Sequence, residues 1–159
     1  MLSREYLINR GTCCGLGCLM CPYEPKHTEG VTKVMRKLIN CFKEDNPLIQ
    51  KTLRKVSVEE GYKVATELLE ILNKRKDGIG LAANQVGIDA AVAVLNVREP
   101  IILINPEIVS KEEEIRYYEG CLSFPKKGCH TKRYKIVEVK TDNNESNMTF
   151  GSGDTDMDL

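Results

Sequence analysis

The chain has 159 residues, of which 42% are hydrophobic, so it can bury one sizeable core and a small appendage. Its 23 basic and 23 acidic residues balance, which gives no argument for nucleic-acid binding, and no direct nucleic-acid motif is visible. There is no run of 18 apolar residues and no apolar leader at the N-terminus. We therefore expect a cytoplasmic protein with no membrane segment.

The first 30 residues form a head that is rich in Cys, Gly and Pro and in which turns dominate. The chain has seven cysteines, an odd number, and four of them crowd into positions 13–21 (CCGLGCLMC). Such crowding suits a bound metal better than a disulfide framework in a reducing compartment. The pattern therefore predicts thiolate chemistry.

Two helices are expected after the head. The first covers residues 31–42 and ends before Asn46-Pro47, with one apolar stripe made of Val31, Met35, Leu38 and Phe42. The second begins at a capping box formed by Ser57 and Glu60 and ends at the basic residues 74–76, which suit the negative end of a helix dipole. Its predicted apolar stripe is Val58, Tyr62, Ala65, Leu69 and Leu72.

Short β-branched runs bounded by turn residues follow and predict strands at 90–97, 101–105 and 134–141. The end of the chain has little apolar content. We expect a turn there and then, over residues 146–159, an acidic flexible tail.

Two segments are candidates for chemistry. In GIGLAANQ (78–85), Gly and Ala leave almost no side chain beside Gln85, so an extended backbone can lie close and the Gln85 amide can donate to a developing oxyanion. In EGCLS (119–123), Cys121 stands between a carboxylate and a hydroxyl. Taken singly, each has a structural interpretation: the first a helix end with a tight turn, the second a small buried hydrophobe.

Together, GIGLAANQVGI and EGCLSFP resemble the first two signature segments of the peptide deformylases, in the right order and at the right separation. The resemblance extends from NPLIQKTLRKVS through LINPEI to RYKIVEVKTDN. It implies an α+β fold of antiparallel strands packed with helices over residues 31–145. It also implies metal-dependent hydrolysis of the N-formyl group of nascent N-formylmethionyl polypeptides, near the ribosome.

The resemblance also implies roles for particular residues. Cys121 would bind Fe(II) or Zn(II) as a thiolate, and Gln85 with the backbone N–H of Leu122 would form the oxyanion hole. The substrate-binding residues would be Gly78, Ile79, Gly80, Glu119 and Gly120. Among these, the backbone of Ile79 and Gly80 would pair with the substrate peptide, and Glu119 would hold the structure beside the pocket for the methionine side chain.

The third family signature is a helix with His-Glu-x-x-His, which supplies two metal ligands and the general acid/base. This chain has two histidines, His27 and His130, and neither lies in such a motif. We expect a deformylase-like fold without that helix and a chain that is inactive alone. Three explanations stand: the front part of a longer or interrupted gene, a protein that lost catalysis, or half of a site that another polypeptide completes. For His130 there are two interpretations, a further ligand of the metal at Cys121 or a polar loop residue, and we favour the second.

The cysteines of the head form a second candidate metal site, for Zn(II) or an iron–sulfur cluster. Its ligands would be Cys13, Cys14, Cys18 and Cys21. Because the adjacent residues Cys13 and Cys14 strain tetrahedral closure, Cys41 or His27 is an alternative to one of them. The alternative is four unpaired cysteines in a disordered leader. Two other functions remain open for the chain: a non-catalytic deformylase-like protein that binds peptide and metal, and a zinc or iron–sulfur module on a degenerate scaffold.

Overall fold

Two units follow one another along the chain, Met1–Lys37 (unit 1) and Leu38–Leu159 (unit 2). The computed structural model describes residues 2–40, 46–75 and 78–151. The division falls after Lys37, later than the boundary at residue 30 expected from composition. The reason lies in the backbone, because the N–H of Glu24 donates to the carbonyl of Lys33 (2.9 Å) and ties residues 31–37 to the head.

Unit 1 begins with the short helix α1 (Arg4–Asn9), where Ser3 accepts a hydrogen bond from the backbone N–H of Tyr6. The buried Tyr23 is the anchor of this unit. Its hydroxyl donates to the carbonyl of Leu7 (2.8 Å), and its backbone forms an antiparallel bridge with Val34. Helix α1 and the segment around Val34 are thus joined through one residue.

The helix expected over residues 31–42 is absent from its described part, residues 31–40, while 41 and 42 lie outside the described residues. The N–H of Met35 donates to the carbonyl of Pro22 (2.6 Å), and Val34 pairs with Tyr23. Because these backbone groups bond to residues 22–24, they are not available to a helical ladder. The predicted helix was wrong for this reason.

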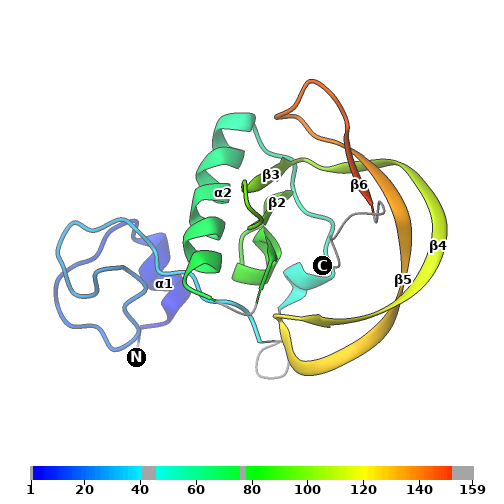
Figure 1. Cartoon of the computed structure of the whole chain (residues 1–159). Helices are drawn as coiled ribbons and strands as arrows, with labels where there is room; N and C mark the ends of the chain where they lie inside the picture. Colours follow the sequence, from blue (N-terminus) through cyan, green and yellow to red (C-terminus); the bar gives the residue numbers. More distant parts are fainter. Residues whose placement is uncertain (1, 41–45, 76–77, 152–159) are drawn as a thin grey trace. The chain divides into compact units, whose positions relative to one another are not determined.

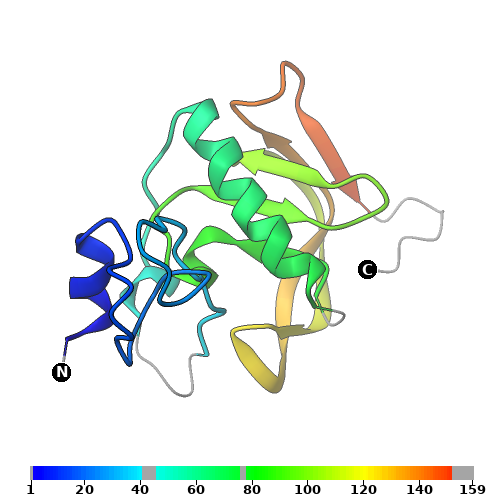
Figure 2. The same ribbon diagram turned by 90° about the vertical axis from the view of Figure 1, so that its left-hand side faces the viewer.

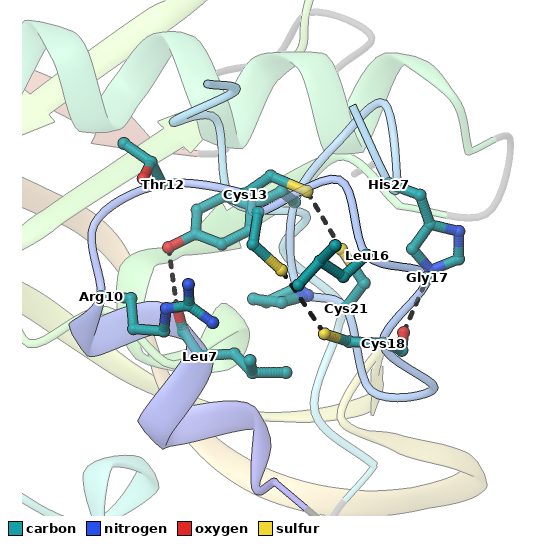
Figure 3. Close-up of a pocket in the computed structure, with 12 residues that line it drawn as sticks. Leu7, Arg10, Thr12, Cys13, Leu16, Gly17, Cys18, Cys21 and His27 are labelled. Atoms are coloured by element: carbon teal, nitrogen blue, oxygen red, sulfur yellow. Dashed lines mark hydrogen bonds between the residues drawn. The ribbon is translucent and has the colours of Figure 1, made fainter. Parts of the chain in front are cut away.

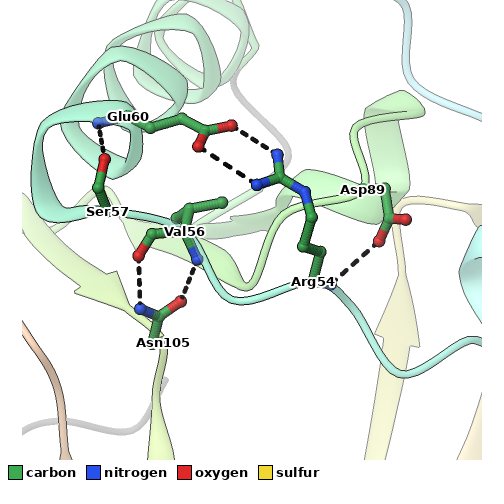
Figure 4. Close-up of polar contacts among 6 residues, drawn as sticks. All are labelled: Arg54, Val56, Ser57, Glu60, Asp89 and Asn105. Atoms are coloured by element: carbon green, nitrogen blue, oxygen red, sulfur yellow. Dashed lines mark hydrogen bonds and ion pairs between the residues drawn. The ribbon is translucent and has the colours of Figure 1, made fainter.

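Unit 2 contains a long helix, α2 (Val58–Asn73), which begins as predicted at Ser57. The Ser57 hydroxyl accepts the N–H of Glu60 (3.2 Å), as an N-cap does (Figure 4). The Glu60 carboxylate does not complete a capping box but pairs with the guanidinium of Arg54 (2.6 Å). The helix ends at Asn73 with Lys74 as its C-cap, slightly before the predicted end.

The buried face of α2 differs from the predicted stripe. Val58 and Tyr62 are exposed, and the buried residues are Gly61, Ala65, Leu68 and Leu72. A Cβ at Gly61 would lie 2.6 Å from Cδ1 of Ile104, so only glycine admits that side chain. The close contact with strand β3 thus decides which face turns inward.

Helix α2 packs on a three-stranded antiparallel sheet of order β1-β2-β3 (Figure 1). Its strands are β1 (Gly80–Ala82), β2 (Val92–Leu95) and β3 (Ile101–Ile104). The second and third strands confirm two of the predicted runs. The core between helix and sheet is apolar throughout and includes Leu68, Leu72, Leu81, Val92, Val94 and Ile104.

Asn105, directly after β3, connects three segments of unit 2. Its backbone is left-handed (φ 50°), and its side chain is buried. The amide exchanges hydrogen bonds with the backbone of Val56 (3.0 and 2.8 Å; Figure 4) and donates to Asp142 (2.6 Å). The start of α2, the end of β3 and the turn after residue 140 are therefore joined at one residue.

A second antiparallel sheet contains a long hairpin, seen beyond helix α2 in Figure 2. It consists of β4 (Glu107–Cys121), β5 (Phe124–Lys140) and β6 (Met148–Gly151), in the order β4-β5-β6. The run 134–141 was predicted as a strand, but β4 and the first part of β5 were not. The side chains of β4 are mostly exposed, which removes the alternation that marks a half-buried strand.

Residues 148–151 differ from the flexible tail expected from residue 146. They form β6, and its Val139–Met148 register continues the sheet from β5. Backbone pairing does not require apolar side chains, which is why composition missed it. Residues 152–159 of the expected tail lie outside the described residues. The two antiparallel sheets and helix α2 confirm the α+β prediction.

Among the described residues, no helix combines the length and the apolar composition of a membrane-spanning segment.

Candidate functional site

Gln85 lies in the short 3-10 helix η2 (Ala83–Val86) that follows β1. Its side-chain Oε1 accepts the backbone N–H of Ala82 (2.9 Å), and its backbone carbonyl accepts the N–H of Ile39 (2.7 Å). The bond from Ala82 directs the oxygen end of the carboxamide toward β1. The Nε2 end is directed toward Cys121 and Ser123.

The end of strand β4 and the turn after it meet this amide. Nε2 of Gln85 lies 3.8 Å from Sγ of Cys121 and 3.3 Å from Oγ of Ser123. Cys121 is exposed, whereas Ser123 has an exposed fraction of only 1%. The fold thus brings together two residues predicted for the site, Gln85 and Cys121, which are 36 positions apart.

Ser123 was missed as a site residue. It was visible only as the hydroxyl two positions after Cys121, and no pattern in the sequence pairs it with Gln85. A buried hydroxyl needs a hydrogen-bond partner, and the Gln85 amide supplies one. Ser123 therefore helps to orient the side-chain amide of Gln85.

Gly78 and Leu122 are neighbours in the structure. A Cβ at Gly78 would lie 2.6 Å from Cδ1 of Leu122, whose side chain packs against the core of unit 2. The absence of a side chain at Gly78 therefore makes room for Leu122. This contact places the segment after Cys121 against the start of the GIGLAANQ segment.

Strand β1 is an edge strand of its sheet, with Gly80 opposite Leu95 of β2. The carbonyl of Ile79 accepts the N–H of Asn96 (2.6 Å), so the polar backbone groups of Ile79 face β2. Because these groups alternate along an antiparallel strand, those of Gly80 point away from β2. Of the two residues predicted to pair with a peptide, Gly80 is the one that presents its backbone outward.

Glu119 contacts residues of the neighbouring strand β5. Its carboxylate accepts hydrogen bonds from the guanidinium of Arg133 and the hydroxyl of Thr131. The bond from Arg133 lowers the pKa of the Glu119 carboxyl below its ordinary value. Gly120 lies opposite Gly128, and the register shifts between Gly120 and Cys121. The ion pair thus holds the hairpin where the strand turns toward Gln85.

His130 does not reach Cys121. It pairs with Tyr118 in the hairpin, and the two rings meet edge to face with centroids 5.2 Å apart. Within the described ranges, no three His, Cys, Asp or Glu side chains surround a common point at which a metal could bind. Cys121 therefore belongs to no group of three potential ligands among these residues.

The four cysteines of the head form two pairs around a small pocket of unit 1 (Figure 3). Sγ of Cys13 lies 3.8 Å from Sγ of Cys21, and Sγ of Cys14 lies 3.7 Å from Sγ of Cys18. The backbone N–H of Leu16 lowers the pKa of the Cys14 thiol, and that of His27 lowers the pKa of Cys21. The hydrogen bond with Cys14 raises the pKa of Cys18.

Comparison with known families now gives the class of the fold and site. A family model described as polypeptide deformylase matches residues 39–152, most of the chain. The chain therefore belongs to the peptide deformylase family.

Among the relatives, "Peptide deformylase 2" of Vibrio parahaemolyticus is 38% identical over 103 residues, which are 58% of this chain and 61% of that protein. "Peptide deformylase" of Buchnera aphidicola is 33% identical over 116 residues, 70% of this chain and 68% of the relative. The first of these matches thus spans less than two thirds of the relative's length.

Solved structures show the same fold. The peptide deformylase from Thermotoga maritima is 31% identical, with a TM-score of 0.61 over 72% of this chain and 79% of that one. A probable peptide deformylase from Synechococcus phage S-SSM7 is 26% identical, with a TM-score of 0.63 over 74% of this chain and 84% of that one. The cysteine-rich head lies outside the family match, which begins at residue 39.

Proposed function

We propose that this chain supplies the substrate-binding and oxyanion-stabilising part of a peptide deformylase, which removes the N-formyl group from nascent N-formylmethionyl polypeptides near the ribosome. The observation that carries the proposal is the position of the Gln85 amide beside the exposed Cys121. Family membership supports the reaction class. The products would be formate and a free amine.

Gln85 and Leu122 would stabilise the tetrahedral intermediate. The Gln85 amide is already oriented by Ala82 and Ser123. It therefore needs little reorientation when negative charge develops on the formyl oxygen. One such donor contributes about 3 to 4 kcal/mol to the transition state. The backbone N–H of Leu122, the residue after Cys121, would be the second donor.

Strand β1 would hold the peptide. The outward backbone of Gly80 offers one N–H and one carbonyl to an extended chain, which would add to the edge of the sheet. Gly78 and Ile79 precede this position, and Glu119 with Gly120 shape the facing hairpin end. Small residues along β1 let the substrate backbone approach closely.

The metal of the family, Fe(II) or Zn(II), would be bound by the Cys121 thiolate and would supply a nucleophilic water at neutral pH. Cys121 fits as a soft, exposed ligand, but the described residues do not complete a site around it. We therefore assign only this one ligand to the chain. A metal at the head cysteines would serve the fold of unit 1 and not this reaction.

Peptide binding tests the proposal separately from turnover. A formyl-Met-Ala-Ser peptide is titrated into the ¹⁵N-labelled chain, and backbone amide shifts are expected at Gly80, Gln85 and Leu122. Gln85→Ala should weaken binding about tenfold, the loss of one hydrogen bond to a polar group. Gln50→Ala, in the loop before α2, is the matched control and should bind as the parent does. Shifts confined to other residues would contradict the proposal.

Formate release with added Fe(II) or Ni(II) tests the chemistry. Release that Cys121→Ala abolishes and Cys129→Ala preserves would establish catalysis by this chain. Peptide binding without release would favour the second candidate, a deformylase-like protein that binds peptide without hydrolysing it.

A further inference from the structure

The core of unit 1 consists largely of cysteine side chains. Its central cluster of buried residues is Cys13, Cys21 and Tyr23, with Cys18, Val31 and Val34 packed against it. A unit that ends at Lys37 is below the size, about 40 residues, at which a domain usually folds without a disulfide, a metal or a partner. The thiols are the groups through which such a cross-link can form.

The sulfur separations distinguish a metal from a disulfide. Four sulfurs about 2.3 Å from a tetrahedral Zn(II) are about 3.8 Å from one another. The two pairs measure 3.8 Å for Cys13–Cys21 and 3.7 Å for Cys14–Cys18, whereas a disulfide needs about 2.05 Å. Each pair therefore already has the length of one edge of a tetrathiolate site.

Backbone contacts hold the segment that carries the cysteines. The N–H of Cys21 donates to the carbonyl of Cys18 (3.0 Å), and the N–H of Cys13 donates to the carbonyl of Val31 (2.8 Å). Gly15 and Gly17, both at positive φ, turn the chain between Cys14 and Cys18. These contacts fix the backbone of Cys13, Cys18 and Cys21 within unit 1.

Further N–H groups point at the sulfurs. The backbone N–H of Leu16 donates to Cys14, and those of His27 and Tyr23 donate to Cys21. The imidazole of His27 lies 3.0 Å from the carbonyl of Cys18, so its contact is with the backbone.

We propose that Cys13, Cys14, Cys18 and Cys21 bind one Zn(II) as a tetrathiolate site that holds unit 1 folded. No three of these sulfurs surround a common point in the described structure, so binding brings the two pairs together around the ion. Four thiol protons are released to solvent as the four Zn–S bonds form. The site is separate from the proposed deformylase function, which needs none of these residues.

The full chain carrying Cys121→Ser is the protein to test, because this change removes the thiol assigned to the other site. Titration with ZnCl₂ under reducing conditions should give one bound zinc per chain, and Co(II) should give the thiolate charge-transfer band of a tetrahedral site. Cys13→Ser/Cys21→Ser and Cys14→Ser/Cys18→Ser should each lower zinc affinity at least a hundredfold. The exposed Cys129→Ser in β5 is the matched control and should change nothing.

A readout without head variants guards against misfolding. Chelation of zinc from the Cys121→Ser chain should speed amide hydrogen exchange in residues 2–37 and leave α2 protected. The proposal is overturned if reduced chain binds no zinc, if the double variants keep their zinc, or if the isolated protein holds the four cysteines as disulfides or an iron–sulfur cluster.

Discussion

The side-chain Nε2 of Gln85 donates to the hydroxyl of Ser123 across 3.3 Å, while the side-chain Oε1 of Gln85 accepts the N–H of Ala82 at 2.9 Å. The two bonds engage the two different ends of the carboxamide and so favour one of its two orientations. Ser123 is almost fully buried, so this contact also satisfies its hydroxyl. Ser123 is therefore a positioning residue for the proposed oxyanion donor.

Ser123→Ala should destabilise the protein by about 1 kcal/mol, because a part-buried donor loses its acceptor. Peptide affinity should fall as well, since Gln85 gains freedom to rotate. Urea unfolding followed by circular dichroism measures the first effect, and the peptide titration measures the second. Ser110→Ala, which removes an exposed hydroxyl bonded to Glu138, is the control and should leave both nearly unchanged. Equal effects at the two serines would show that Ser123 has no special role.

Gly61→Ala should destabilise unit 2 although alanine is the better helix former. The gain in helix propensity is about 1 kcal/mol, but the new Cβ would lie 2.6 Å from Ile104 Cδ1, and overpacking a core costs about 1 to 3 kcal/mol. We expect a lower urea midpoint. The exposed Thr66→Ala on the same helix should be neutral or stabilising. A higher midpoint for Gly61→Ala would mean that α2 and β3 pack less closely.

Asn105→Asp should lower the free energy of unfolding by about 1 to 3 kcal/mol at pH 7. The change keeps the shape but removes the donor to Val56 and Asp142 and brings two carboxylates together. Urea unfolding again measures the effect. Asn147→Asp is a matched control, because Asn147 is exposed and also donates to a carboxylate, that of Glu138. The control should change stability by less than about 0.5 kcal/mol.

Asp89 should contribute to the acid sensitivity of unit 2. The ammonium of Lys51 and the backbone N–H of Arg54 bind its carboxylate and lower its pKa below the ordinary value of about 3.9. A lowered folded pKa adds stability above the ordinary pKa, and that stability is lost as the pH falls through the folded value. The urea midpoints of parent and Asp89→Asn should therefore differ at pH 6 and converge toward pH 3. A difference between the two midpoints that stays constant from pH 6 to pH 3 would contradict this expectation.

Short sequence patterns correctly predicted those elements that depend only on interactions between residues close together in the chain. Ser57 caps α2 because its hydroxyl needs only the N–H three residues later. The predicted helix over residues 31–42 had an equally regular apolar stripe, but its backbone groups form hydrogen bonds with residues 22–24 instead. The apolar stripe of α2 was assigned partly to the wrong side, because the contact of Gly61 with Ile104 is not local.

The sequence by itself determined the family, through GIGLAANQ and EGCLS, and with it the fold class and the candidate residues Gln85 and Cys121. Only the tertiary structure decided that Gln85 is oriented by Ser123 and that Gly80 presents its backbone outward. It also decided that residues 148–151 join a sheet and that the head cysteines pair as Cys13–Cys21 and Cys14–Cys18. These features depend on hydrogen bonds and contacts between residues distant along the chain, which short-range patterns of side-chain type do not specify.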